Sequence, residues 1–358
     1  MRRPPSLPSG PYVPPVPERE LTVVSADGSR IHTELHGPED APAVVLAHGW
    51  VCSTAFWAPV LRALSADHRV IVYDQRGHGR SPAPGPGGYS TQALADDLVA
   101  VVDATLPPGR RAVLAGHSMG AMTLMAAADR PILRERAAAA VLCSTGASRL
   151  VDRARVVPLR SPRARSRVHR LLLGSRAPLG PVTPLSLRLV RYVTMGPGTD
   201  PATVEVAARI LHACPRAVRA GWARVLLDLA LDARIGRLTM PTAVIVGTAD
   251  RLTPPEHAHA LAAALPHCTG LTELPGLGHM TPLEDPEAVA GVIRGLAGEY
   301  GTSGETDLTT SQGPRPTTQE FHPTSQESHS RESHSRESHL TTVTEAGHTA
   351  VEAKEQTA

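Results

Sequence analysis

Residues 112–129 read AVLAGHSMGAMTLMAAAD, and this stretch decides the fold. An apolar run typical of a buried strand leads into the pattern G-x-S-x-G, and a helix-forming run follows it. Ser118 would then lie on the sharp turn between strand and helix, where the helix directs its N-terminal N–H groups and its dipole at the serine. Glycines at 116 and 120 suit such a strained corner. A Gly/Ser turn without chemistry is the alternative, and the strand-to-helix context weighs against it.

Apolar runs of the same kind recur along the chain and predict an α/β fold. Such runs are typical of strands buried on both faces. They are AVVLA (43–47), VIVYD (70–74), AAVLCS (139–144) and TAVIVG (242–247). Helix-like segments lie near 55–65, 90–105, 119–129, 256–264 and 284–297. This alternation predicts a mostly parallel central sheet with helices on both faces. Ahead of it, RELTVVS and RIHTELH flank Ala26-Asp27-Gly28 and predict a hairpin.

The alternation is interrupted where the sequence becomes helical and basic. Residues 149–237 contain seventeen arginines and five acidic residues. Because this block separates two strands, it predicts a helical cap over the carboxyl ends of the sheet. The predicted parts are a Pro-rich disordered lead-in (1–18), a core (19–146 and 239–300), a helical cap insertion (147–238) and a disordered Ser/Thr/His/Glu-rich tail (301–358).

The composition fits a soluble globular protein, with 41% hydrophobic residues, 20% charged residues and a net charge of +2. This balance predicts no general attraction to nucleic acid or to membranes. The four cysteines have neither metal-ligand spacing nor a disulfide pattern. Because the start of the chain lacks the apolar stretch of a signal peptide, and no segment has the roughly 18 apolar residues of a membrane span, we expect a cytoplasmic protein.

A serine hydroxyl becomes a good nucleophile only when a base takes its proton, and His279 is the best candidate for that base. It lies in the glycine-rich loop LPGLGHMTPLEDP (274–286), between the last strand-like segment and the last helix. Open α/β sheets build their sites from loops at the carboxyl ends of strands. The alternative is a histidine in a solvated turn.

Other histidines fit the role of base less well. His117 is adjacent to the serine and is expected to point elsewhere on the turn. His257 and His259 are expected on the surface of a helix. His169 and His212 lie in the predicted cap and remain outside candidates.

Asp250 is the predicted partner of the base, because a carboxylate fixes the tautomer of a catalytic histidine and stabilises its charged form. It lies in VIVGTADRLTP (244–254), three residues after the glycine that ends an apolar strand. It would emerge at the same sheet edge as Ser118 and His279. An aspartate that caps a helix is the alternative, but the chain order Ser, Asp, His is the one expected after a G-x-S-x-G turn.

An oxyanion hole needs two backbone donors beside the nucleophile. Met119 N–H, directly after the serine, is one. The second is predicted in the loop after AVVLA, with Trp50 N–H preferred and Val51 N–H next. Trp50, Val51 and His117 are also the predicted substrate contacts. His48 is expected to tie this loop to its neighbours.

Five motifs in this order resemble the α/β-hydrolase superfamily, in its esterase-like branch with a helical cap. They are HGW (48–50), DQRGHGRS (74–81), GHSMG (116–120), GTADRLTP (247–254) and GHM (278–280). The resemblance covers about 20–300 and implies the fold, the Ser-His-Asp triad and the absence of any metal or organic cofactor.

The resemblance also implies roles for single residues. In that family DxRGHGxS is a structural loop, which assigns Asp74, Arg76 and His78 to architecture. Ala121 stands where many relatives have a second glycine. A serine nucleophile separates the chain from the epoxide hydrolases and haloalkane dehalogenases of this fold, which use aspartate.

These residues predict a serine hydrolase that cleaves a carboxylic ester, or a related acyl compound with a hydrophobic part, through an acyl-serine intermediate. Hydrolysis of a C–C bond or a lactone, perhydrolysis, and a lyase step on the same triad stay open. A slow-turnover small-molecule receptor or binding protein is the alternative of another class. The expected partner is the small-molecule substrate. Neither nucleic acid nor stable membrane association is expected, and the oligomeric state is left open.

The predicted cap offers two further features. Its arginines would either attract an anionic substrate or form a solvated surface. The segments VVPLRSP (156–162) and RAPLGPVTPLSLRLV (176–190) are apolar enough to form the face that binds an acyl chain.

Overall fold

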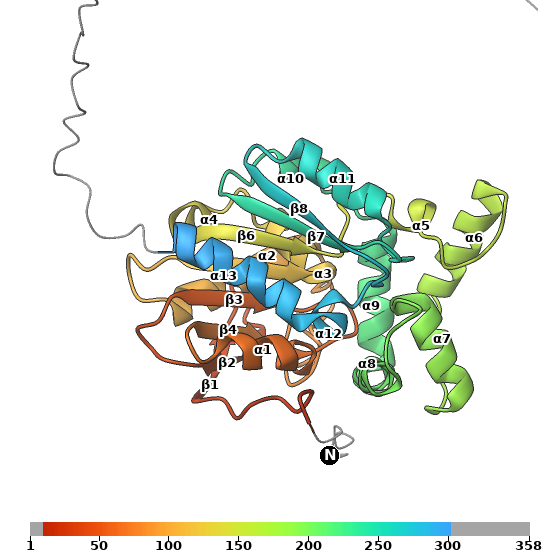
Figure 1. Ribbon diagram of the computed structural model, residues 1–358, viewed down its shortest axis with the longest axis horizontal. Coiled ribbons are helices and arrows are strands. Elements are labelled where there is room, and N and C mark those ends of the chain that lie inside the picture. The colour runs from red at the N-terminus through yellow and green to blue at the C-terminus, as the bar shows by residue number, and fades with distance from the viewer. Residues whose placement is uncertain (1–9, 302–358) are drawn as a thin grey trace, which may run out of the picture. The chain divides into compact units, whose positions relative to one another are not determined.

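A central sheet of eight strands carries the fold (Figure 1). The computed structural model describes residues 10–301, so residues 1–9 of the predicted lead-in and the predicted tail beyond Gly301 lie outside the described residues. The strands are β1 (Arg19–Val24), β2 (Arg30–His36), β3 (Ala43–Ala47), β4 (Arg69–Tyr73), β5 (Ala112–His117), β6 (Ala137–Cys143), β7 (Thr242–Gly247) and β8 (Cys268–Leu274).

The sheet has the order β1-β2-β4-β3-β5-β6-β7-β8. β1 and β2 form the predicted hairpin, β2 pairs antiparallel with β4, and the pairs from β4 to β8 are all parallel. The prediction of a mostly parallel sheet is therefore confirmed. Its consequence is that the carboxyl ends of β3, β5, β6, β7 and β8 meet at one edge.

Helices cover both faces of the sheet, as predicted, and the period-two alternation of each strand decides which side chains they meet. In β3, Val44 and Leu46 join the cluster formed with α1 and α13, whereas Val45 and Ala47 join the cluster formed with α2, α3 and α11. Figure 1 shows α1 and α13 in front of the strands. The helices of these layers are η1 (Thr54–Trp57), α1 (Ala58–Leu64), α2 (Thr91–Thr105), α3 (Met119–Ala126), α4 (Pro131–Arg136), α11 (Pro255–Ala264), α12 (Thr281–Glu284) and α13 (Pro286–Tyr300).

Between β6 and β7 the chain forms six helices, and an isolated antiparallel bridge pairs Ser148 with Ala230. They are α5 (Leu150–Arg153), α6 (Pro162–Leu173), α7 (Pro184–Thr194), α8 (Pro201–Ala213), α9 (Arg216–Leu227) and α10 (Asp232–Ile235). Three of them, α6, α7 and α8, begin with the same signal, a proline at the first helical position preceded by a side chain that caps the backbone N–H groups. The caps are Ser161 for α6, Thr183 for α7 and Asp200 for α8. We call α5 to α10 the inserted helices.

Two remaining sequence features concern the environment of the chain. The four cysteines are all free thiols. Among residues 10–301, no helix combines the length and the apolar character that crossing a bilayer requires.

Candidate active site

Ser118 lies on the turn between β5 and α3, with φ 51° and ψ −114°. A non-glycine residue with positive φ is strained by about 1–3 kcal/mol, which surrounding packing must offset. The two glycines of the motif make the turn possible. A Cβ on Gly116 would overlap the backbone nitrogen of Ala121, and a Cβ on Gly120 would overlap the carbonyl oxygen of Ala47. The predicted turn is therefore present, and it leaves the serine partly exposed.

His279 and Asp250 are brought together by the loops after β8 and β7. His279 Nδ1 lies 2.8 Å from Asp250 Oδ2, and both side chains are buried. Asp250 Oδ2 also accepts from Thr253 Oγ1, at 2.8 Å, and Asp250 Oδ1 accepts the backbone N–H groups of Leu252 and Thr253. An ionised Asp250 would hold the proton of His279 on Nδ1 and leave Nε2 free to act as a base.

The hydrogen bonds of Asp250 keep it ionised. Burial alone raises the pKa of this carboxyl, but the charge and hydrogen bond of His279 and the donors from Thr253 outweigh burial, so the pKa of Asp250 is held below its ordinary value. At neutral pH the carboxylate is the stable form. The pair therefore has the charge distribution that a catalytic base requires.

Hydrogen bonds to the inserted helices hold the backbone around His279 in place. The N–H groups of His279 and Met280 both donate to the carbonyl oxygen of Thr194, at the end of α7, at 2.9 and 3.2 Å. A Cβ on Gly278 would overlap the backbone of Met195, so only glycine allows the histidine loop to pass this close. The role of Thr194 could not be predicted from the sequence, because no local pattern marks a backbone carbonyl oxygen as the acceptor for a distant loop.

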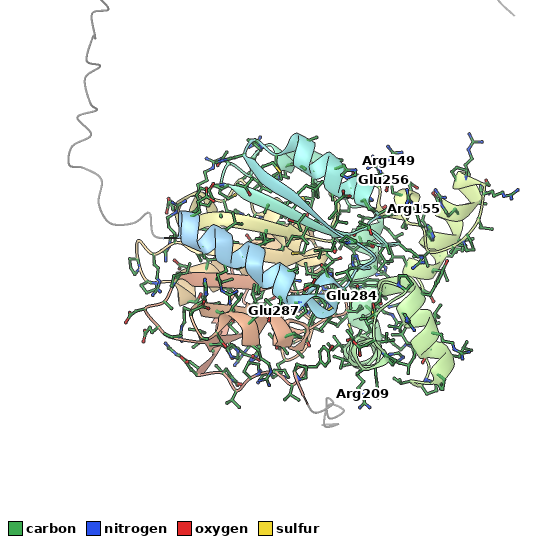
Figure 2. All side chains as sticks on the ribbon, viewed as in Figure 1. Arg149, Arg155, Arg209, Glu256, Glu284 and Glu287 are labelled. Carbon is green, nitrogen blue, oxygen red and sulfur yellow. The ribbon has the colours of Figure 1, made fainter. Side chains whose placement is uncertain are left out.

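Glu284 in α12 joins the histidine loop to the inserted helices, and Figure 2 shows it beside them. Its Oε2 accepts from Gly196 N at 2.7 Å and from Thr199 Oγ1 at 2.7 Å. The same carboxylate accepts from Gly278 N at 3.0 Å and from Met280 N at 3.2 Å. One carboxylate thus satisfies four donors from two segments. The sequence analysis did not single out this residue.

His117 was predicted to contact substrate, but the structure places it elsewhere. Its ring is 1% exposed and packs on Phe56, with ring centroids 4.5 Å apart. Its Nε2–H donates to the carbonyl oxygen of His279 at 2.8 Å. Burial, and then the charge of His279, lower the pKa of His117 to about 3, so the ring is neutral. His117 therefore holds the histidine loop rather than facing a substrate.

The loop after β3 borders the serine. A Cβ on Gly49 would lie 2.7 Å from His117 Nδ1 and 3.3 Å from Ser118 Cβ. Within residues 10–301, the N–H groups of Trp50 and Met119 donate to no acceptor. Neither N–H is therefore occupied by a partner from these residues, and the oxyanion role of both stays a prediction.

The second choice for the oxyanion hole, Val51, differs from Trp50. Its N–H donates to His78 Nε2 at 3.2 Å, and its φ is 58°. Its side chain is buried at 8% exposure, whereas Trp50 is half-buried and its Nε1–H donates to the carbonyl oxygen of Arg219 in α9. Val51 N–H is thus already engaged, and the role of Trp50 N–H as the second donor stays a prediction.

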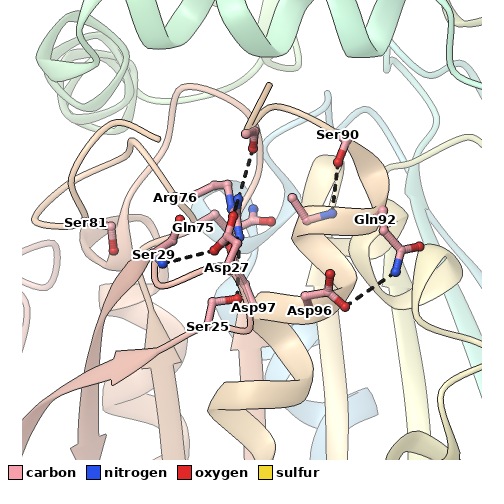
Figure 3. A network of polar contacts seen from close by, with 12 residues as sticks. Ser25, Asp27, Ser29, Gln75, Arg76, Ser81, Ser90, Gln92, Asp96 and Asp97 are labelled. Atoms are coloured by element: carbon pink, nitrogen blue, oxygen red, sulfur yellow. Dashed lines mark hydrogen bonds and ion pairs between the residues drawn. The ribbon is translucent and has the colours of Figure 1, made fainter. Parts of the chain in front are cut away.

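The segment 74–81 performs structural work. Arg76 is buried, and its guanidinium lies between Asp97 of α2 and Asp27 of the β1–β2 turn (Figure 3). Asp74 accepts the backbone N–H groups of Thr54 and Arg80, at 2.7 and 2.8 Å. This segment ties the hairpin, α2 and the loop after β3 into one frame. Asp74 and Arg76 were predicted to be architectural, but the pairing of Arg76 with Asp27 and Asp97 was not predicted.

The contacts of His48 agree with its expected role. Its Nδ1–H donates to Gly49 O at 2.8 Å, and its Nε2 accepts from Gln75 N at 3.0 Å. His48 therefore joins the loop after β3 to the loop after β4.

The prediction that His257 lies on the surface is wrong. It is 4% exposed, because the loop after β6 covers this face of α11, and Gly146 packs against its ring. His259, two residues on, is exposed as predicted. In the inserted helices, His169 accepts from Val157 N and donates to Val151 O, which is a structural role.

One group of side chains in residues 10–301 has the spacing of a metal site. Ligand atoms of Glu20, His32 and Glu34 lie within 4.8 Å of one another. The Arg80 guanidinium pairs with both carboxylates of this group. The single positive charge of Arg80 therefore already offsets part of the negative charge that a cation would meet.

Comparison with known proteins identifies the family of the chain. The profile of the α/β-hydrolase family matches residues 44–292. A protein of Variovorax paradoxus named as a candidate carbamate hydrolase, RutD, is 36% identical over 251 residues, which cover 70% of this chain and 89% of the relative. Its namesake in Stutzerimonas stutzeri is 32% identical over 260 residues, covering 72% and 92%. A solved esterase from Thermogutta terrifontis is 26% identical with a TM-score of 0.64, covering 79% of this chain and 100% of that one. The chain is therefore a hydrolase and belongs to the α/β-hydrolase family.

Proposed function

We propose that the protein is a serine hydrolase that cleaves a carboxylic ester through an acyl intermediate on Ser118. The observation that carries the proposal is the buried Asp250–His279 pair, with 2.8 Å between Oδ2 and Nδ1, at the sheet edge where the strained serine stands. Two backbone donors without an acceptor among residues 10–301, Trp50 N–H and Met119 N–H, belong to the loop next to the serine and to the residue that follows it. Nucleophile, base, orienting carboxylate and oxyanion donors are the complete set for acyl transfer.

In the first half of the proposed reaction, Ser118 Oγ attacks the ester carbonyl while its proton passes to His279 Nε2. The carbonyl oxygen becomes an oxyanion and accepts from Trp50 N–H and Met119 N–H. Each such donor contributes roughly 10²–10³ in rate. The C–O bond to the alcohol then breaks, and the alcohol leaves with the proton from His279, so that an acyl ester of Ser118 remains.

In the second half, water attacks the acyl ester while His279 Nε2 takes one of its protons. A second oxyanion forms in the same hole. When it collapses, the bond to Ser118 Oγ breaks, the serine regains its proton from His279, and the carboxylic acid is released. The ester and one water molecule are the reactants that the atom balance requires.

The inserted helices, in this proposal, act as a cap over the site. They contact both catalytic loops: Arg219 O of α9 accepts from the Trp50 ring, and Thr194 O of α7 accepts from His279 N–H. A cap held to these loops would limit the access of water and shape the space for the acyl group.

Carbamates are a second candidate substrate class. The two relatives named as carbamate hydrolases cover most of the chain at 36% and 32% identity. A carbamate carbonyl would react with Ser118 by the same steps and give a carbamoyl-serine intermediate. The residues described above suit both carbonyls, so substrate comparison must separate them.

The first test is labelling with a fluorophosphonate probe, followed by peptide mapping. We expect Ser118 to be labelled in the wild-type protein and no label in Ser118→Ala. Absence of label in folded wild-type protein would contradict the proposal and favour a binding protein.

If Ser118 is labelled, paired p-nitrophenyl esters and aryl carbamates with matched leaving groups decide the substrate class. We expect kcat/KM to be higher for the esters. A higher value for the carbamates would establish the second candidate. Turnover too slow to follow with either set would support a receptor.

A further inference from the structure

An unusual concentration of exposed apolar side chains lies on α6, α7 and the segment between them. Within residues 10–301, eight of the ten large hydrophobic side chains that are exposed fall between 159 and 192. We define the outer face as the six most central of them: Leu171, Leu172, Leu179, Val182, Leu185 and Leu189. Four of the six lie within residues 176–190, which were predicted to form part of the face that binds an acyl chain. Exposure of 74% for Leu171 and for Leu185 shows that the outer face meets solvent instead.

Packing within the fold does not explain these side chains. α7 already directs one apolar stripe inward, where Leu187 and Val190 pack against the core. Leu185 and Leu189 form a second stripe, one turn apart, on the exposed side. Contiguous exposed apolar surface marks a binding surface, so the second apolar side of α7 indicates a partner outside the fold.

Charge identifies the partner. From 153 to 199 the chain contains ten arginines and no acidic residue. Arg163 and Arg167 on α6 and Arg188 on α7 are exposed, and none of them forms an ion pair with any residue from 10 to 301. Figure 2 shows nitrogen-tipped side chains extending from the free end of α6. The partner must therefore be both apolar and anionic.

A second copy of the chain fits this requirement poorly. Two outer faces in a symmetric contact would bring the same arginines opposite one another, with no acidic side chain from this segment to pair with them. A bilayer with anionic phospholipid supplies both properties, since headgroup phosphates pair with arginine and acyl chains accept leucine side chains at shallow depth.

We propose that the outer face binds reversibly to the surface of a membrane that contains anionic phospholipid. This contact is interfacial, with nothing crossing the bilayer, so it differs from the stable association that the sequence argued against. The outer face adjoins the site, because α7 ends at Thr194, whose carbonyl oxygen holds His279 N–H. Binding to lipid requires no turnover, so this proposal stands whether or not the proposed hydrolysis does.

The test is flotation of the full-length protein with vesicles at about 0.15 M salt. We expect partition onto vesicles of equimolar phosphatidylglycerol and phosphatidylcholine, and none onto phosphatidylcholine alone. The variant Arg163→Gln/Arg167→Gln/Arg188→Gln should lower the partition coefficient at least about tenfold. A matched variant changes three arginines elsewhere that are also exposed and free of ion pairs within residues 10–301: Arg19→Gln/Arg30→Gln/Arg134→Gln. It should change the coefficient less than about twofold.

The apolar part of the outer face needs its own variant. Leu185→Ser/Leu189→Ser should lower partition about tenfold while the charge is unchanged. Melting curves check that each variant is folded, and hydrolysis of a water-soluble ester is measured in parallel as a separate property. The proposal is overturned if the wild-type protein does not partition, if both arginine variants lose binding equally, or if the leucine variant binds as well as the wild type.

Discussion

His117 Nε2 lies 2.8 Å from the carbonyl oxygen of His279, so the residue before the nucleophile holds the backbone of the candidate base. The two rings are 5.0 Å apart, and His117 is neutral and buried. The site therefore contains a contact between the nucleophile turn and the histidine loop that does not involve either reacting group. Its role is positional, because the donated proton fixes where the loop runs.

Replacement of His117 by phenylalanine removes this donor and leaves the His279 carbonyl oxygen without it. We expect kcat for an ester substrate to fall about 10–100-fold, with a much smaller change in KM, because displacement of the base by a fraction of an ångström disturbs proton transfer. His117→Gln can still donate through its amide and should recover part of kcat. Equal kcat in His117→Phe and wild type, or loss of KM alone, would show that the contact does not position His279.

Asp250→Asn tests the orienting carboxylate. An amide at this position no longer stabilises the charged histidine and favours the wrong tautomer of His279, so kcat should fall by about 10³–10⁴. The protein should remain folded, since the shape is unchanged. Steady-state kinetics with a p-nitrophenyl ester measure the effect, and Asp103→Asn, at an exposed position of α2, is the matched control. A fall of less than tenfold would assign Asp250 to structure, the helix-capping alternative.

Part of this architecture could be predicted from the sequence because it depends on neighbouring residues. The turn at Ser118 follows from two glycines and an apolar run within a few positions, and Asp250 and His279 follow strands whose carboxyl ends must meet in a parallel sheet. The three residues lie at one edge because the strands are parallel, and the alternation of strands and helices already predicted a parallel sheet.

What could not be predicted depends on contacts between distant segments. His117 and His279 are 162 positions apart, and Glu284 reaches Gly196 over 88 positions. In neither pair does the surrounding sequence show that the two residues will be in contact. His257 shows the same limit, because the residues that cover its helix face lie in the loop after β6. The outer leucines of α7 differ, because their apolar stripe was visible in the sequence. Whether the stripe faces the site or the solvent could not be predicted from its spacing.

Glu284→Gln tests the junction between the histidine loop and the inserted helices. Glutamine offers one acceptor where the carboxylate has two, and its NH₂ group would face backbone donors such as those of Gly196 and Gly278. We expect a loss of about 1–3 kcal/mol in the free energy of unfolding, together with a lower kcat. Glu287→Gln, exposed at the start of α13 and labelled beside Glu284 in Figure 2, is the matched control for both readouts. If the two variants unfold alike, the four hydrogen bonds of Glu284 contribute little.

The buried His257 predicts how stability depends on pH. Burial, and next the charge of Arg153, lower the pKa of His257 to about 4, whereas the unfolded chain has the ordinary value near 6.5. Between these values the unfolded state binds more protons, so stability is full above pH 6.5 and declines as the pH falls toward 4. His257→Gln removes this contribution.

We expect the unfolding free energy of wild type to fall about 1–3 kcal/mol further than that of His257→Gln over this window. Urea titrations at a series of pH values measure the difference. The other buried histidines are present in both proteins, so their contributions to the pH dependence cancel. His259→Gln, on the exposed side of the same helix, should follow the wild-type curve. Parallel curves for wild type and His257→Gln would mean that the ring gains a proton without cost inside the fold. Water would then reach His257 Nε2, which has no hydrogen-bond partner among residues 10–301.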